Sequence, residues 1–238
     1  MKQVRSSAWA PLRRNYRRMR DATLIITLVC VVAFAGFLGL RPTPRPQPAR
    51  MSSTVAFIGD SYVGGSNMGG TKGNNFTAHL ARQLSCQVLN TARGGTGFVA
   101  RGAGVGSYQE SQFPIVETQK PDFVVVVASR NDASEPNVGQ AAIFLFTSIR
   151  RALPGVRLLL VGPIWINGEP PSSILNIRDQ VKGAAQLLGV PFVDPLEEGW
   201  FAGPAASLIG SDGVHPTDDG HLRMARLLGD DLIRLNLL

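Results

Sequence analysis

The chain has 238 residues and a formal net charge of +7, yet the basic excess lies almost wholly at its N-terminus. Residues 1–50 hold ten of the 24 basic side chains and one of the 17 acidic ones. Residues 51–238 therefore hold 14 basic and 16 acidic side chains, a net charge of −2. That balance excludes the basic surface on which nucleic-acid binding depends. The two cysteines and three histidines form no cluster with metal-ligand spacing, so we predict neither a metal site nor a cofactor.

A basic segment, residues 1–21, precedes an uncharged apolar run over residues 22–40. As a helix that rises about 1.5 Å per residue, the run would just cross the roughly 30 Å hydrocarbon core of a membrane. The arginines before it would stay cytoplasmic and place the rest of the chain outside. A cleaved signal peptide is the alternative, because Ala33-Phe34-Ala35 resembles a cleavage site, although it lies within the run. We predict a transmembrane signal-anchor in the cytoplasmic membrane, or a secreted protein if the segment is cleaved.

Residues 41–50, RPTPRPQPAR, alternate proline with polar or basic residues. Proline fixes φ and disfavours helix in the residue before it, so this stretch is predicted to be an extended linker. A single globular domain is then expected over residues 51–238.

Within that domain, short apolar runs alternate with helical patterns. The runs are predicted to be strands buried on both faces, and they cover residues 55–58, 87–89, 123–127, 156–161 and 191–193. The helical patterns cover residues 75–85, 138–152, 173–188 and 217–235. This alternation predicts an α/β fold with a parallel sheet of about five strands, covered by helices on both sides.

Three motifs directly follow predicted strands, at the edge of the sheet where loops converge. In Gly59-Asp60-Ser61, a serine after a tight glycine turn is well placed to be a nucleophile. The glycines of residues 94–97 leave backbone N–H groups open to a developing negative charge, and Asn131 offers a side-chain N–H donor. Each motif alone is also compatible with a plain turn or helix cap.

A fourth motif, Asp212-Gly213-Val214-His215-Pro216, lies before the last predicted helix. A histidine acts as a general base only if it is oriented, and Asp212 could hold its second ring nitrogen. Asp218 and His221 have the same spacing, but there Thr217 or Asp218 is better explained as the cap of the last helix. His79 has no acidic residue nearby in the sequence, and we expect it to be structural.

In this order the four motifs resemble the signature blocks of the SGNH (GDSL-like) hydrolases, over essentially all of residues 51–238. The resemblance implies a flavodoxin-like three-layer α/β/α sandwich, the SGNH hydrolase fold. It also implies that His215 takes the proton of Ser61 while Asp212 fixes the histidine tautomer. The oxyanion hole would consist of the Ser61 and Gly97 backbone N–H groups and the Asn131 side chain.

The chain departs from the family's pattern at Ser129, where the third block usually begins with glycine. An added side chain there is expected to narrow the pocket or change its polarity. Three aromatic residues in loops near strand ends, Trp165, Trp200 and Phe201, are weaker candidates for lining that pocket.

The resemblance implies a serine-dependent ester hydrolase with an acyl-serine intermediate. We expect its substrates to be short-chain acyl esters, because the domain lacks an obvious long apolar lid segment. The ester could be a small molecule or be carried on a glycan. One alternative is an O-acyltransferase that acts on cell-surface glycans. Another is a non-catalytic ligand-binding or glycan-binding module, which the presence of Ser61, Asp212 and His215 disfavours. The other expected partner is the membrane, through residues 22–40; nucleic acid is not one, and the oligomeric state is open.

Overall fold

The computed structural model describes residues 53–65, 72–166, 168–202 and 207–237. The predicted anchor (22–40) and linker (41–50) lie outside these residues. Within the described ranges, none of the helices combines the length and the apolar character needed to cross a bilayer.

Five parallel strands form one sheet in the order β2-β1-β3-β4-β5. The strands are β1 (Thr54–Ile58), β2 (Gln87–Asn90), β3 (Phe123–Val127), β4 (Arg157–Val161) and β5 (Phe192–Val193). The predicted α/β fold with a five-stranded parallel sheet is therefore confirmed. The strand order reverses between β1 and β3, and in sheets of this type ligands bind near that reversal, at the carboxyl ends of the strands.

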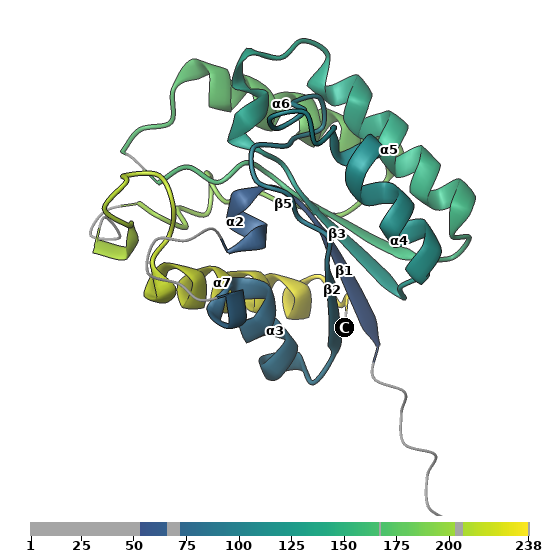
Figure 1. The fold of residues 1–238 in the computed structure, drawn as a ribbon, viewed down its shortest axis with the longest axis horizontal. Coiled ribbons are helices and arrows are strands. Elements are labelled where there is room, and N and C mark those ends of the chain that lie inside the picture. Colours follow the sequence, from purple (N-terminus) through teal and green to yellow (C-terminus); the bar gives the residue numbers. More distant parts are fainter. Residues whose placement is uncertain (1–52, 66–71, 167, 203–206, 238) are drawn as a thin grey trace, which may run out of the picture. The chain divides into compact units, whose positions relative to one another are not determined.

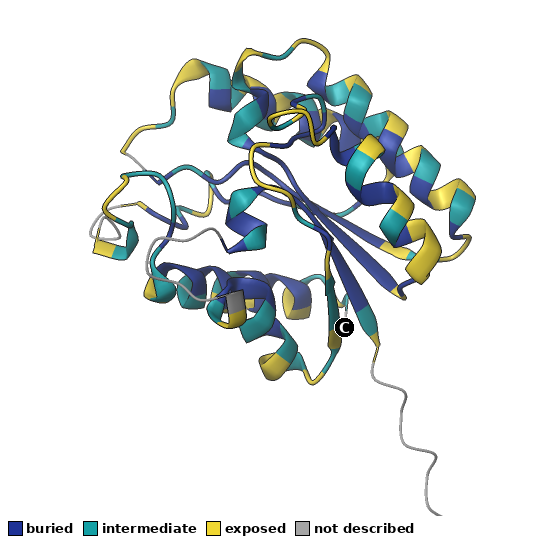
Figure 2. Cartoon of the chain, in the orientation of Figure 1, coloured by how far each residue is buried: buried dark blue, intermediate teal, exposed yellow. Residues whose placement is uncertain are grey.

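Helices cover both faces of the sheet (Figure 1). One layer contains α4 (Phe113–Gln119), α5 (Val138–Ala152) and α6 (Ser172–Leu188); the other contains α3 (Phe76–Leu84) and α7 (Asp218–Arg234). Strand β3 contributes to the hydrophobic cores on both faces of the sheet. Val124 and Val126 pack against the first layer, and Val125 and Val127 pack against the second. Figure 2 shows the result, with buried central strands between helices whose outer sides are exposed.

Side-chain caps explain where two of the helices begin. The Asn75 side chain accepts a hydrogen bond from the Ala78 N–H at the start of α3, and the Thr217 side chain accepts one from Gly220 at the start of α7. Of the two caps predicted for the last helix, Thr217 and Asp218, the structure uses Thr217. Each of the four predicted helices begins and ends within one residue of the observed bounds.

The structure differs from the prediction in several places. Strand β2 is not buried on both faces, because it is an edge strand whose residues are half-buried or exposed. A π-helical turn (Tyr108–Gln112) followed by α4, and a 3₁₀ turn over Arg130–Ser134, were not expected. These segments are short, and short segments give little periodic signal.

Candidate active site

Ser61 is the first residue of a four-residue helix, α2 (Ser61–Gly64), at the carboxyl end of β1. Asp60 caps this helix, since its Oδ1 accepts the N–H of Tyr62 at 2.9 Å. A Cβ on Gly59 would lie 2.2 Å from Val63 Cγ2, so the close return of the chain after β1 requires glycine. The Gly59-Asp60-Ser61 motif therefore holds the serine on a tight turn at the mouth of the sheet, and Asp60 orders that turn.

A continuous series of hydrogen bonds joins Asp212, His215 and Ser61. His215 Nε2 lies 2.9 Å from Ser61 Oγ, and its Nδ1 lies 2.6 Å from Asp212 Oδ2. The other carboxylate oxygen of Asp212 accepts the backbone N–H groups of Val214 and His215 at 2.9 and 3.0 Å. Hydrogen bonds from the backbone and the ring of His215 lower the pKa of Asp212 to about 2, so this carboxylate is ionised at neutral pH. The arrangement can pass a proton from the serine hydroxyl to the imidazole.

The other two histidines lie elsewhere. His221 is buried inside α7, where its ring is nearly parallel to Phe76 at 6.4 Å and burial lowers its pKa to about 4. Nδ1 of His79 lies 3.0 Å from Nη2 of Arg82, on the same helix. Of the two Asp-His pairs with equal spacing, the structure thus brings Asp212 and His215 to Ser61.

Asp132 holds the glycine-containing loop that follows β2. Its carboxylate accepts the backbone N–H groups of Phe98, Val99 and Ala100 at 2.8, 3.0 and 2.8 Å. Burial raises the pKa of Asp132, and these three hydrogen bonds oppose the rise. A Cβ on Gly97 would lie 2.3 Å from Asp132 Oδ1, so the loop can approach only without a side chain there. No role was predicted for Asp132, whose only local signal in the sequence is its position after Asn131.

Gly97, the predicted oxyanion donor, is buried, and its N–H donates to the Ala100 carbonyl at 2.9 Å. Gly95, two positions earlier, is exposed with φ +75°. Its N–H and that of Ser61 make no hydrogen bond within the part of the chain that the structure describes. Asn131 Nδ2 donates to the Thr96 carbonyl at 3.0 Å and lies 3.5 Å from Asp60 Oδ2, so its second hydrogen is only weakly engaged.

Ser129 does not face a substrate pocket, which corrects the expectation that it narrows one. It is fully buried, and its hydroxyl donates to Asp60 Oδ2 at 2.5 Å while accepting the Asn131 N–H at 2.9 Å. Burial raises the pKa of the Asp60 carboxyl, and hydrogen bonds from Ser129 and from the Tyr62 N–H oppose that rise. The residue therefore links the turn that carries Ser61 to the turn that carries Asn131.

Ser129→Ala is expected to lower the free energy of unfolding by about 1–3 kcal/mol, because a buried carboxylate loses its donor. We expect kcat for ester hydrolysis to fall a few-fold as well, since the Asn131 N–H loses its acceptor. Urea unfolding and steady-state kinetics measure the two effects. Ser129→Gly, which installs the residue usual in the family, should behave alike. A free energy of unfolding unchanged within about 0.5 kcal/mol in both variants would show that the hydrogen bond contributes nothing to stability.

The three predicted pocket aromatics, Trp165, Trp200 and Phe201, line one hollow of about 130 Å³ formed by the segments after β4 and β5. Trp200 and Phe201 are 1% and 6% exposed, and Trp200 Nε1 donates to Glu198 at 2.8 Å, so both mainly pack the core. Trp165 is half-buried, with the Arg130 guanidinium 4.5 Å over its ring. Trp165 is accordingly the least buried of the three.

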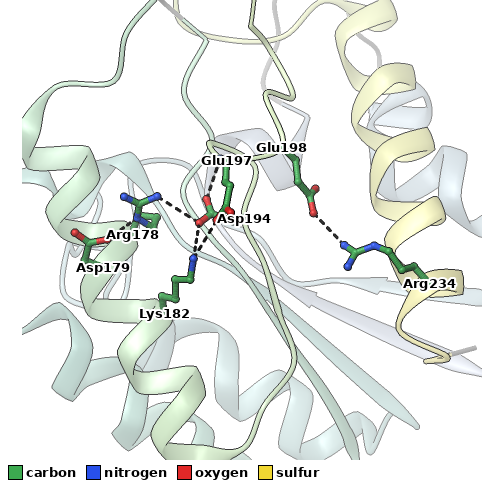
Figure 3. Close-up of polar contacts among 7 residues, drawn as sticks. All are labelled: Arg178, Asp179, Lys182, Asp194, Glu197, Glu198 and Arg234. Atoms are coloured by element: carbon green, nitrogen blue, oxygen red, sulfur yellow. Dashed lines mark hydrogen bonds and ion pairs between the residues drawn. The ribbon is translucent and has the colours of Figure 1, made fainter.

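Charged side chains fix the segment after β5 from two sides (Figure 3). Asp194 lies directly after β5, and its Oδ2 forms ion pairs with Arg178 Nη1 and Lys182 Nζ of α6, each at 3.4 Å. Glu198 pairs with Arg234 of α7 at 3.0 Å. Such partly exposed pairs each contribute little stability. Here their effect is to hold in place the backbone that carries Trp200.

A model of the GDSL-like lipase/acylhydrolase family matches residues 57–223. The GDSL lipase Rv0518 of Mycobacterium tuberculosis is 33% identical over 217 residues, which cover 87% of this chain and 94% of that protein.

Solved structures with the same fold include a family two carbohydrate esterase from Clostridium thermocellum in complex with cellohexaose. It has a TM-score of 0.63 and 21% identity, covering 82% of this chain and 68% of that one. A lipolytic protein of the G-D-S-L family from Desulfitobacterium hafniense has a TM-score of 0.59 and 15% identity, covering 75% of this chain and 99% of that one.

Proposed function

Because the chain belongs to the GDSL-like lipase/acylhydrolase family, we propose that it is a serine-dependent ester hydrolase with Ser61 as its nucleophile. The observation that carries this proposal is the hydrogen-bonded series from Asp212 through His215 to Ser61 Oγ. A nucleophile, a base within reach and a carboxylate that orients the base are the parts that acyl transfer needs. A non-catalytic binding module would have no need to keep all three aligned.

In the proposed mechanism, neutral His215 donates from Nδ1 to Asp212 and accepts the Ser61 proton at Nε2 as Oγ attacks the ester carbonyl. Asp212 stabilises the imidazolium that results. The Ser61 N–H, the Gly95 N–H and the weakly engaged hydrogen of the Asn131 amide are the donors we assign to the oxyanion. The alcohol leaves with the proton from His215, and water then releases the acid from the acyl-serine by the same steps.

The acyl group is proposed to be short. The support is in the sequence, because residues 51–238 contain no obvious long apolar segment that could act as a lid over a bulky acyl chain. One structural relative is a carbohydrate esterase, so acetylated sugars belong among the substrates to test. A sugar hydroxyl could also replace water as the acyl acceptor, which would make the protein an O-acyltransferase.

We further propose that the domain acts outside the cytoplasmic membrane. The support is in the sequence alone: the uncharged run of residues 22–40 and the arginines that precede it.

Covalent labelling tests the assignment most directly. The full chain, purified in detergent, is treated with a fluorophosphonate probe and mapped by mass spectrometry, and p-nitrophenyl acetate, butyrate and octanoate are offered as substrates. We expect the label on Ser61 and the fastest hydrolysis with acetate or butyrate. A folded protein that shows neither labelling nor hydrolysis would refute the proposal. Labelling without hydrolysis would favour the transferase, which acetylated and free sugars would then test.

A further inference from the structure

Tyr62 immediately follows Ser61 and has no part in the mechanism above. Its side chain is only 3% exposed. Its ring faces the His215 ring at a centroid distance of 5.8 Å and an angle of 45°. The side chain therefore lies between the turn that carries the nucleophile and the loop that carries the base.

The Tyr62 hydroxyl donates to the backbone carbonyl of Val214. That carbonyl belongs to the peptide group that leads into His215, and the N–H of the same group donates to Asp212 Oδ1 at 3.0 Å. The peptide group is thus held from both sides, by the phenol at its oxygen and by the carboxylate at its nitrogen. Because the plane of this peptide determines where the His215 side chain starts, both contacts constrain the imidazole.

The alignment of serine and histidine depends on two distant parts of the chain, since Ser61 and His215 are 154 positions apart. The histidine loop is braced within itself by the Gly210 N–H to the His215 carbonyl at 2.7 Å and by the Thr217 N–H to the Leu208 carbonyl at 2.8 Å. These bonds shape the loop but do not attach it to α2. A hydrogen bond from the residue next to the nucleophile does attach it there.

The phenol keeps its proton at any pH where the enzyme would work. Burial raises the pKa of Tyr62 to about 12, and the neighbouring Arg130 guanidinium only partly offsets this. The charged groups around it are Arg130, Asp60 and Asp212, with His215 against the ring. A donor that does not titrate suits a fixed structural contact.

We propose that Tyr62 is a positioning residue, which holds the Val214–His215 peptide so that Nε2 of His215 stays within hydrogen-bond distance of Ser61 Oγ. This inference rests on the proposed function, because it assigns Tyr62 a part in the same reaction.

The test is Tyr62→Phe, which keeps the ring and removes the donor. We expect kcat for p-nitrophenyl acetate to fall about 10- to 100-fold with KM within about twofold of wild type, since small misplacements of a reacting group have effects of this size. The rate of fluorophosphonate labelling of Ser61 should fall in parallel. The NMR signals of the His215 ring should shift or broaden, and this last measurement needs no turnover.

Tyr108→Phe is the matched control, because Tyr108 is also fully buried and its hydroxyl also donates to a backbone carbonyl, that of Val127 at 3.0 Å. We expect it to lower the urea midpoint about as much as Tyr62→Phe, with kcat within a few-fold of wild type because its hydroxyl also neighbours Ser129, and with the His215 signals unchanged. Equal losses of kcat in the two variants, or wild-type kcat and His215 signals in Tyr62→Phe, would overturn the positioning role. If the wild type neither hydrolyses esters nor is labelled, the proposed function fails, and the His215 signals still decide whether Tyr62 holds the imidazole.

Discussion

Replacing Ser61 with alanine is expected to lower kcat for ester hydrolysis by about 10⁴- to 10⁶-fold, because the variant lacks the atom that forms the acyl intermediate. The fold should be retained. The helix that begins at Ser61 is capped by Asp60, whose Oδ1 accepts the Tyr62 N–H, and this contact does not involve the serine side chain. Steady-state hydrolysis of p-nitrophenyl acetate, with circular dichroism and urea unfolding on the same preparation, measures both quantities.

Ser111→Ala is a suitable control for this prediction. The Ser111 hydroxyl is part-buried and donates to the Ser107 carbonyl at 2.8 Å, so its removal changes a serine of similar exposure that has no place in the proposed mechanism. Activity near that of the wild type is expected for Ser111→Ala. If Ser61→Ala kept more than about a tenth of the activity, another residue would have to be the nucleophile.

The fold was largely predictable because its signals are local. The apolar runs of β1, β3 and β4 are long enough to stand out, and each of the four predicted helices was found within one residue of its bounds. The position of strand β2 was predicted correctly, but its residues are half-buried or exposed rather than buried on both faces. Whether a strand lies at the edge of a sheet depends on the order of all the strands, and the four residues of β2 do not reveal it.

In the candidate site, too, the local relationships could be predicted and the long-range contacts could not. Asp212 and His215 are neighbours on one loop, so their spacing alone suggested that the carboxylate reaches the ring. The N–H of Gly97 donates to the Ala100 carbonyl, and the spacing of glycines in a sequence does not show which of their N–H groups remains open. Ser129 was misplaced for a similar reason, since its hydroxyl turns inward to a carboxylate 69 positions away. Contacts of that kind become visible only once the chain is folded.

Asp212→Asn is expected to lower kcat by about 10³- to 10⁴-fold while the protein stays folded, because the amide keeps the shape of the carboxylate and loses its charge. An amide that turns its NH₂ toward the ring would favour the tautomer with the proton on Nε2, where His215 can no longer accept from Ser61. The pKa of Asp212 is lowered to about 2, below its ordinary range, so the carboxylate stays charged until the pH falls toward that value. Loss of wild-type activity between about pH 7 and 4 should therefore not reflect protonation of Asp212.

Asp218→Asn provides the matched comparison, because Asp218 precedes His221 by the same interval as Asp212 precedes His215. Asp218 is the first residue of α7, and its carboxylate lies 3.5 Å from the Asn74 amide. His221 is buried against Phe76. We expect Asp218→Asn to keep nearly full kcat, with at most a modest loss of stability. If the two substitutions had equal effects on kcat, Asp212 would have no special claim to orient the base. A large effect confined to Asp212→Asn would assign the orienting role to the pair whose histidine reaches Ser61.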